Sequence, residues 1–487
     1  MQIVYSNRGG KRRIEHIGSA HDHVELELLK TVARQRISAG QGELELGLPA
    51  PPAVGGPLPI TASRMGLLWD ALTASYRHLG FDTVTGGDEV FQALVLARIV
   101  EPTSKLDTLR VLQEVGVAVP SYRTVARRLP VFAKETWRTG LSSACAAHAQ
   151  LGPTSLVLYD VSTLYFETDT GDGFREPGFS KERRLEPQIT IGLLVDADGF
   201  PLRVESFEGN KAETTTMIPT IKAFMAAHRL TDVTIVADAG MVSDSNKKAL
   251  ETEGLSFIIG ARIPELPWVV SDWHKRNPDV EMADQQVWVQ PMPASPKDQR
   301  RDHTIFYQYR ADRARRTLHG VEAQVSKARQ AIAGKTAIKR NRFVQINGGT
   351  TELNQPLIDK TTALAGLKGY VTNLPNPTAD QVISAYHQLW HVEKAFRMSK
   401  HDLSARPIYH HLRESIDAHL TIVMAALAVS KWVETTTGWS IRKFVKTTRR
   451  YRTITIQAGD HILTAADPPP ADLGVALEAI RARSNGH

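Results

Sequence analysis

The sequence has little of what marks secreted, fibrous or membrane proteins. Its 487 residues include a single cysteine, Cys145, which excludes an internal disulfide and fits a reducing compartment. With 34 Gly and 26 Pro, the chain is too poor in both for a fibrous or low-complexity protein. Its longest nearly apolar stretch, from Leu420 to Val429, is about half of what a bilayer requires. We therefore expect a globular cytoplasmic protein of about two to four folding units, neither exported nor inserted into a membrane.

Acidic charge is also scarce in parts of the chain. The 59 Lys and Arg outnumber the 52 Asp and Glu, which gives a formal net charge of +7. The stretch from Lys297 to Arg342 alone holds 13 basic and 4 acidic residues, a net +9, and residues 441–452 hold 6 basic residues and no acidic one. Such runs are often solvated helix faces, but together they favour a polyanionic partner.

The first part of the chain reads mostly as helix. A short strand, a hairpin turn at Asn7 to Lys11 and an amphipathic helix from Val24 to Ile37 precede a Pro- and Gly-rich linker at 47–59, where we place a boundary. From Met65 to Leu129, apolar residues recur three and four positions apart, which is typical of helices.

The segment SYRTVARRL at 121–129 is a candidate DNA-contacting helix. A serine at its start can cap it, and the helix would carry Arg123, Arg127 and Arg128. This pattern predicts the recognition helix of a helix-turn-helix, with a basic surface helix that reads no DNA as the alternative. On the first interpretation, residues 1–150 form a mostly helical DNA-binding region.

From about residue 151 the pattern changes to α/β. Three apolar strands are followed by a helix, a strand, a helix and a strand, predicted at 155–160, in the two halves of 187–210, and at Glu213–His228, 232–240, Ser243–Glu253 and 256–262. The first three strands can form a meander, whereas the later ones need crossover connections. We predict a mixed sheet covered by helices, as the first part of a core that spans 151–262.

This pattern stops after Arg262 and resumes about 110 residues later. In between, QQVWVQ, HTIFYQYR, RFVQIN and GLKGYVTNL read as strands, interrupted by one basic amphipathic helix near Thr317 to Ile332. Helical patterns return at 379–400 and 412–432. We therefore predict a β-rich basic insertion at 263–372. It is followed by the second part of the α/β core at 373–440 and by a basic C-terminal tail at 441–487.

Two carboxylates follow apolar strands. Asp160 ends LVLY and Asp238 ends TIVA, so neighbouring strands would bring both to one edge of a sheet. Two anions so close repel each other unless a cation neutralises them. Oxygen ligands without a Cys/His cluster favour Mg²⁺ or Mn²⁺ over zinc. For either aspartate alone, a turn or helix cap is the competing interpretation.

A third acid lies in YHQLWHVEKAFRMSK. Tyr386, Leu389, Glu393, Arg397 and Lys400 are spaced three or four positions apart, so they share one face of a predicted helix. Glu393 is costly to bury on such a face unless it is paired or ligates a metal. An exposed ion pair between Glu393 and Arg397 is the ordinary alternative.

The blocks VLYDVSTLYFE, VADAGM and YHQLWHVEKAFRMSK resemble the three acidic blocks of DDE transposases of bacterial insertion sequences. The resemblance, over roughly 150–430, is to the branch that carries a Tyr-x2-Arg-x3-Glu-x6-Lys signature. Tyr386, Glu393 and Lys400 fall on this signature, and Leu389 stands at its Arg position. The fold implied is α/β, a ribonuclease-H-like mixed sheet flanked by helices and interrupted by a β-rich insertion, with a mostly helical N-terminal domain.

The resemblance implies a DNA transposase that binds terminal inverted repeats, cleaves at the ends of the element and joins a 3′-OH to target DNA. Its catalytic residues would be Asp160, Asp238 and Glu393, which would hold two Mg²⁺ or Mn²⁺ ions, with Asp160 bridging them. A catalytically inactive transposon-derived DNA-binding protein and a nuclease without strand transfer are the alternatives.

The implied partners are double-stranded DNA, as inverted repeats and as target, and a second copy in a homodimeric synaptic complex associated with the nucleoid. The DNA contacts would come from Tyr386, Arg397 and Lys400, beside Arg123, Arg127 and Arg128. The basic insertion would clamp the transposon end. Its Trp268, Trp273 and Trp288 would stack on a flipped base or, alternatively, pack in the core.

Overall fold

The structure is a computed structural model, and it describes residues 1–6, 12–20, 22–38, 58–152, 155–168, 170–178, 186–212, 215–228, 230, 233–240, 242–294, 301–335, 341–347, 350–406, 408–458 and 460–484. The chain divides into two compact units, described in turn. The first comprises Met1–His78, Lys105–Thr124 and Val433–His487, and the second comprises Leu79–Ser104 and Val125–Trp432. The predicted hairpin turn at Asn7–Lys11 and all but the last two residues of the predicted linker at 47–59 lie outside the described residues.

The first unit contains segments from both ends of the chain. Strands β1 (Gln2–Ser6) and β2 (Arg12–His16) form an antiparallel hairpin and are followed by α1 (His23–Ser38). A second antiparallel sheet has the order β15-β14-β3. Its strands are His461–Ala466, Thr453–Ala458 and Ile60–Arg64. The helices of this unit include α2 (Gly66–His78), α5 (Asp107–Val115), α16 (Ile441–Thr448) and α17 (Ala471–Ser484). Most of the predicted tail is therefore folded, because β14 pairs with a strand from near the start of the chain.

Helices from the N-terminal region also belong to the second unit. They include α3 (Phe81–Val84), α4 (Glu89–Val100) and α7 (Glu135–His148). Helix α6 (Tyr122–Phe132) begins in the first unit and continues into the second. Its predicted cap is confirmed, since the Oγ of Ser121 accepts a hydrogen bond from the Thr124 N–H at 3.1 Å.

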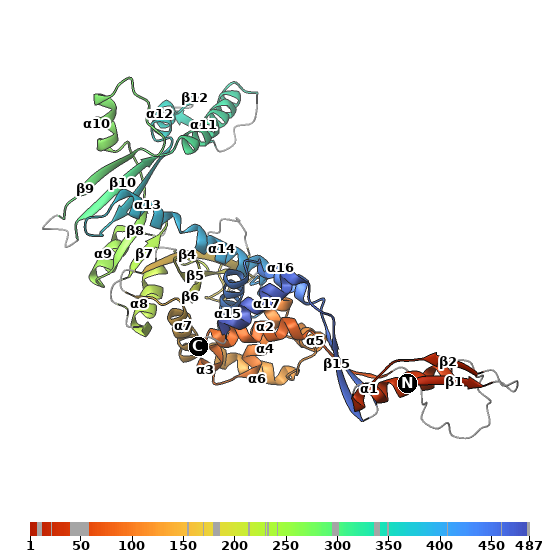
Figure 1. The fold of residues 1–487 in the computed structure, drawn as a ribbon. Helices are drawn as coiled ribbons and strands as arrows, with labels where there is room; N and C mark the ends of the chain where they lie inside the picture. Colours follow the sequence, from red (N-terminus) through yellow and green to blue (C-terminus); the bar gives the residue numbers. More distant parts are fainter. Residues whose placement is uncertain are drawn as a thin grey trace. The chain divides into compact units, whose positions relative to one another are not determined.

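A mixed sheet of eight strands organises the second unit (Figure 1), in the order β6-β5-β4-β7-β8-β13-β10-β9. The strands are Pro201–Glu208, Gln188–Asp196, Leu156–Tyr165, Thr234–Ala237, Ser256–Ala261, Leu367–Thr372, His303–Tyr309 and Val287–Met292. The first three in sequence form the predicted meander, whereas β4, β7 and β8 are parallel. Helices α8 (Met217–His228) and α9 (Asp244–Thr252) provide the crossovers, as predicted.

Apolar residues on both faces keep the centre of this sheet buried. All four residues of β7 and five of the six in β8 are buried, as parallel strands covered on two sides require. On one side they pack with Phe224 of α8 and Leu250 of α9. On the other, residues of α15 (Arg413–Thr437) line a small cavity with β4, β5 and β6. Among the described residues, α15 is the one helix long and apolar enough to cross a membrane, and 94% of its most apolar window is buried.

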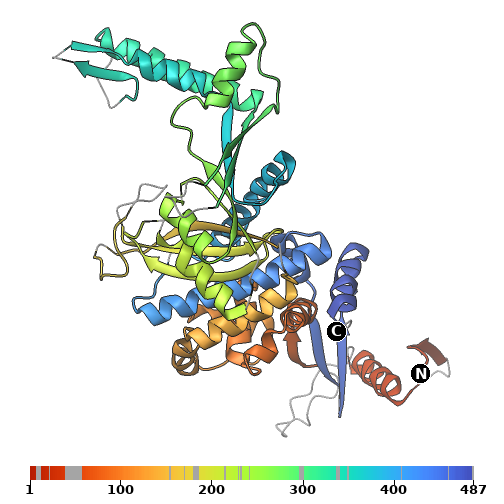
Figure 2. The same cartoon turned by 90° about the vertical axis from the view of Figure 1, so that its left-hand side faces the viewer.

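The predicted insertion extends the core sheet. Strands β13, β10 and β9 pair antiparallel beyond β8, so they continue the same sheet (Figure 2). The expectation of a single helix in this segment was wrong, because its described residues form three: α10 (Trp268–Arg276), α11 (Ala311–Ile332) and α12 (Gln355–Ala363). A separate hairpin of β11 (Val344–Asn347) and β12 (Thr350–Leu353) packs near α11.

The helix predicted at 379–400 is divided into three pieces. Helix α13 (Ala379–His387) is followed by α14 (Trp390–Arg397), and the turn between them is tightened by a hydrogen bond from the Leu389 N–H to the Tyr386 carbonyl at 3.2 Å. A π-helical turn, η2 (Met398–Asp402), then replaces the α-helix. Because a π turn is wider than an α turn, residues beyond Met398 leave the face that Glu393 occupies.

Candidate active site

The two predicted aspartates lie on neighbouring strands. Strand β4 pairs in parallel with β7 from Leu156 to Leu158, and Asp238 directly follows the last residue of β7. The prediction that Asp160 ends its strand was wrong, because pairing with β5 continues β4 to Tyr165. Asp160 instead lies where β4 runs past the end of β7. The two carboxylates therefore emerge at the same edge, although only one of them ends a strand.

Glu393 faces the same cavity as the two aspartates. Asp160, Asp238 and Glu393 line a cavity of 270 Å³, together with Tyr159, Lys368, Tyr386, His387, Leu389, Trp390 and Val392. The side chain of Asp160 is half-buried, whereas Asp238 and Glu393 are exposed. Three acids from a strand, a strand end and a helix thus converge on one opening; we refer to it as the acid cavity.

A close backbone contact supports the start of α14 beside this cavity. Gly199, in the turn between β5 and β6, has a φ of +80°, and a Cβ there would lie 3.0 Å from both the Cβ and the carbonyl oxygen of His391. Glycine is required at this position by its backbone conformation as well as by the contact. The hairpin turn can therefore pack directly against α14, the helix that carries Glu393.

Tyr386 holds Asp238 in place. Its hydroxyl donates a hydrogen bond of 2.5 Å to Oδ1 of Asp238, and the residue is only 4% exposed. Burial, followed by the bond to Asp238, raises the pKa of Tyr386, so the hydroxyl stays a donor. A Cβ on Gly260 of β8 would lie 2.8 Å from this hydroxyl oxygen, so glycine there leaves room for the contact.

Lys368 also lines the acid cavity, and the sequence analysis did not predict it. It lies on β13, and its Nζ is 4.2 Å from the centroid of the Tyr386 ring. Burial lowers the pKa of Lys368, while the charges of Asp238 and Glu393 oppose that shift. One signal could have identified it: Lys368 is the only charged residue in the strand LKGYVT.

The chemistry of this donor set suits a hard divalent cation. Three carboxylates offer oxygen ligands only, which Mg²⁺ and Mn²⁺ prefer. One oxygen of Asp160 accepts the Val161 N–H at 2.8 Å, and one oxygen of Asp238 accepts a hydrogen bond from the Tyr386 hydroxyl. Within the described ranges, no three His, Cys, Asp or Glu side chains are gathered closely enough to form a metal cluster. Ion binding would therefore require the three carboxylates to come closer together than they lie here.

The remaining residues of the predicted helical face are not gathered in this cavity. Leu389 is buried and lines it, but Arg397 is exposed at the end of α14 and does not. Lys400 lies in the π-helical turn and lines a different, largely apolar cavity with Leu164 and Ile191. The predicted common face therefore extends from Tyr386 to Glu393 and ends before Lys400.

The three arginines of α6 differ in their surroundings. Arg123 and Arg127 are exposed, as expected for residues that contact DNA. Arg128 is half-buried, pairs with Asp88 at the start of α4, and lies 5.7 Å from the centroid of the Phe132 ring. Arg128 therefore has a structural partner that the sequence did not reveal.

The tryptophans of the insertion also differ from one another. Trp288 of β9 is 8% exposed and packs edge-on against Trp273 of α10 at 5.7 Å. This is the core packing that we gave as the alternative to base stacking. Trp268, at the start of α10, is 62% exposed.

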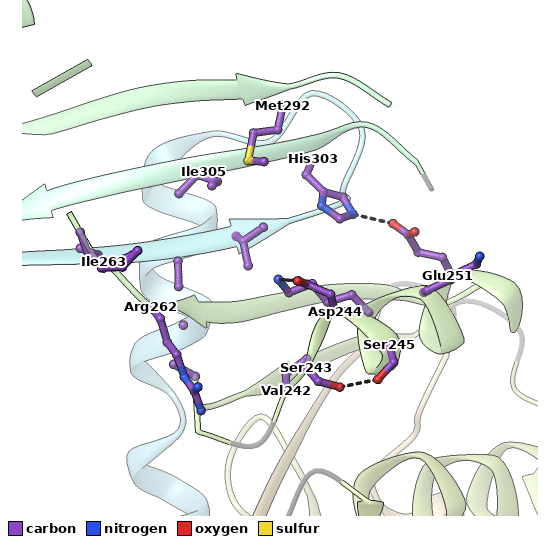
Figure 3. Close-up of a pocket in the computed structure, with 17 residues that line it drawn as sticks. Val242, Ser243, Asp244, Ser245, Glu251, Arg262, Ile263, Met292, His303 and Ile305 are labelled. Atoms are coloured by element: carbon purple, nitrogen blue, oxygen red, sulfur yellow. Dashed lines mark hydrogen bonds and ion pairs between the residues drawn. The ribbon is translucent and has the colours of Figure 1, made fainter. Parts of the chain in front are cut away.

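A second and larger cavity is lined by residues of α9 and β10 (Figure 3). Its volume is 1120 Å³, and its lining includes Lys247, Lys248 and Arg262. At one end, Glu251 of α9 and His303 of β10 face each other, with 2.7 Å between Oε1 and Nε2. Both side chains are buried, and Glu251 also accepts the Arg301 N–H at 3.3 Å. The pair links the insertion to a core helix, and no local pattern in the sequence predicts a contact between residues so far apart.

The family model for the transposase DDE domain matches residues 151–429. Curated protein sequences gave no match. Among solved structures, the chain is similar to one described as a piggyBac transposase synaptic complex with hairpin DNA, at 12% identity and a TM-score of 0.39, over 88% of this chain and 77% of that one.

Proposed function

The chain belongs to the transposase DDE domain family, and from this we propose that it cleaves DNA at the ends of a mobile element and joins the freed 3′-OH to target DNA. The observation that supports this most strongly is the convergence of Asp160, Asp238 and Glu393 on one cavity. The first and last of these acids, Asp160 and Glu393, lie more than 200 residues apart in the chain. A surface ion pair or a turn cap, the ordinary uses of such residues, would not require that convergence.

Asp160, Asp238 and Glu393 are the proposed ligands of two Mg²⁺ or Mn²⁺ ions. When bound, such ions activate the attacking oxygen and stabilise the leaving one in an in-line displacement at phosphorus. Tyr386 keeps Asp238 oriented through its hydrogen bond, so one ligand is already positioned. Asp238 and Glu393 are exposed, which leaves the scissile phosphate a way in from solvent.

Double-stranded DNA is the proposed partner, both as element ends and as target. The exposed Arg397 lies one turn of α14 beyond Glu393, where it can contact the backbone next to the scissile phosphate. Arg123 and Arg127 are exposed on α6 and are proposed to contact DNA farther from the cut. Because an element has two ends, we propose that two copies of the chain act together in a homodimeric synapse.

An assay on the DNA that flanks the gene tests this function. Purified protein is mixed with a duplex carrying that flanking sequence, a labelled target and Mg²⁺, and the products are separated on a sequencing gel. Joined products are expected. Cuts without joining would indicate a nuclease instead, and a mobility shift without any cut would indicate an inactive DNA-binding protein.

A further inference from the structure

A single strong cation lies in the acid cavity. Of the described residues that line it, Lys368 is the only Lys or Arg, and it shares the lining with three carboxylates. Its Nζ is close enough for Asp238 and Glu393 to act on its pKa. Yet among the ion pairs of the described residues none involves Lys368, so no described carboxylate lies within 4.0 Å of its Nζ. The ammonium therefore shares the cavity with the acids without being bonded to one of them.

Two tyrosine rings lie against this ammonium group. Its Nζ lies 4.2 Å from the centroid of Tyr386 and 5.8 Å from that of Tyr370. The two rings pack edge-on at 4.9 Å, so they form one fixed surface. A cation over ring faces is stabilised without using its N–H donors on a carboxylate. The N–H donors of Lys368 can therefore take up a phosphate oxygen while the side chain keeps its contacts with the two rings.

We propose that Lys368 is the resident counter-ion of the acid cavity and becomes a ligand of the DNA phosphate during the reaction. Without divalent ions, its positive charge offsets the repulsion between Asp238 and Glu393. When the ions and DNA enter, the ammonium moves to a non-bridging oxygen of the phosphate that is cut. This inference rests on the proposed function, since it assigns the same cavity its phosphate and its ions.

The two roles predict effects of opposite sign. A fixed positive charge beside the carboxylates repels a divalent ion, so removing it should strengthen ion binding to the DNA-free protein. Removing a cation that contacts phosphate should weaken DNA binding and lower its salt dependence. A purely structural lysine would not produce this pair of results, because a distorted cavity would weaken both.

The test measures both properties in the full chain. Lys368→Met removes the charge and keeps most of the stem, Lys368→Arg keeps the charge, and Lys222→Gln is a matched control. Lys222 lies on α8 and pairs with Glu253 at 2.7 Å, so it is engaged away from the cavity. Mn²⁺ binding without DNA is followed by electron paramagnetic resonance of the free ion. Binding of an element-end duplex is followed by fluorescence anisotropy at several salt concentrations, with a constant saturating concentration of Ca²⁺, a divalent ion that takes oxygen ligands.

We expect Lys368→Met to bind Mn²⁺ roughly threefold to tenfold more tightly than the wild-type protein. It should bind the duplex more weakly, with a salt slope smaller by about one. Lys368→Arg and Lys222→Gln should keep the wild-type Mn²⁺ affinity, and Lys222→Gln should also keep the wild-type salt slope. Weaker Mn²⁺ binding by Lys368→Met, or an unchanged salt slope, would overturn the inference.

Failure of the proposed function would look different. If Mn²⁺ binding is unaffected by Asp238→Asn and by Glu393→Gln, the acid cavity is not the metal site and the proposed function fails. If those variants lose Mn²⁺ while Lys368→Met matches the wild-type protein in both measurements, the metal site stands and Lys368 has neither role.

Discussion

The acid cavity and the larger cavity lined by α9 and β10 use carboxylates in opposite ways. In the larger cavity, Glu251 is buried and bonded to His303, with a backbone N–H on its other oxygen. In the acid cavity, Asp238 and Glu393 are exposed, and only one of their oxygens has a described hydrogen-bond partner, the Tyr386 hydroxyl. A carboxylate with saturated partners stabilises the fold, whereas acids gathered with spare oxygens are available for an ion or a substrate. Substitutions in the two cavities should therefore affect different properties.

The largest effect is expected at the three acids. Asp160→Asn, Asp238→Asn and Glu393→Gln should each abolish Mg²⁺-dependent cleavage of an element-end duplex, because each removes a proposed ion ligand. Binding to that duplex and thermal stability should remain near the wild-type values. Gel assays of cleavage and anisotropy of binding give the two readouts. An acid whose replacement leaves cleavage intact does not belong to the site.

Tyr386→Phe should have the next largest effect. It keeps the ring under Lys368 but removes the hydroxyl that orients Asp238, and loss of such a partner typically costs about 10–100-fold in activity or metal affinity. Cleavage rates at several Mg²⁺ concentrations measure the change. A rate equal to that of the wild-type protein at all concentrations would mean that the hydrogen bond does not position Asp238.

Glu251→Ala should distinguish the role of the larger cavity from that of the acid cavity. It leaves His303 and the Arg301 N–H without their buried partner, which should cost about 1–3 kcal/mol of stability. Urea unfolding measures that cost, and cleavage per folded molecule should not change. Lost cleavage with unchanged stability would place Glu251 in the functional site and contradict the comparison.

The smallest effects are expected on DNA affinity from the residues beyond Glu393. Arg397→Ala should weaken duplex binding modestly and reduce the salt slope by about one, because Arg397 is exposed. Lys400→Ala should change the same quantities less, since Lys400 is half-buried beside an apolar cavity. Anisotropy at several salt concentrations compares them. The reverse order would mean that the π-helical turn presents Lys400 to DNA after all.

The strands and crossovers in the core of the sheet could be predicted from the sequence, whereas the extension of the sheet by the insertion could not. Apolar runs bounded by turns predicted the meander and both crossovers, because each depends on local pattern. The pairing of β8 with β13 joins segments about 110 residues apart, and no local pattern encodes it. Helix α10 was missed because WVVSDW is rich in residues that favour strands.

The parts of the candidate site that depend on local sequence pattern could also be predicted. Apolar strands next to acids led to Asp160 and Asp238, and helical spacing led to Glu393. The end of β4 was misplaced because VSTLY is less apolar than the run before Asp160, although pairing with β5 keeps it in the strand. Lys368 reaches the cavity only through the register of β13, and Lys400 leaves the common face only because of the π-helical turn.

The most direct test of the central claim asks whether the three acids surround one common metal site. Fe²⁺ is bound in place of Mg²⁺, hydroxyl radicals are generated at the ion with ascorbate and peroxide, and the cut polypeptide is analysed by mass spectrometry. The account predicts backbone cuts near Asp160, Asp238 and Glu393 together, all of them lost in Asp238→Asn. Cuts near only one of these residues, or cuts that persist in Asp238→Asn, would contradict it.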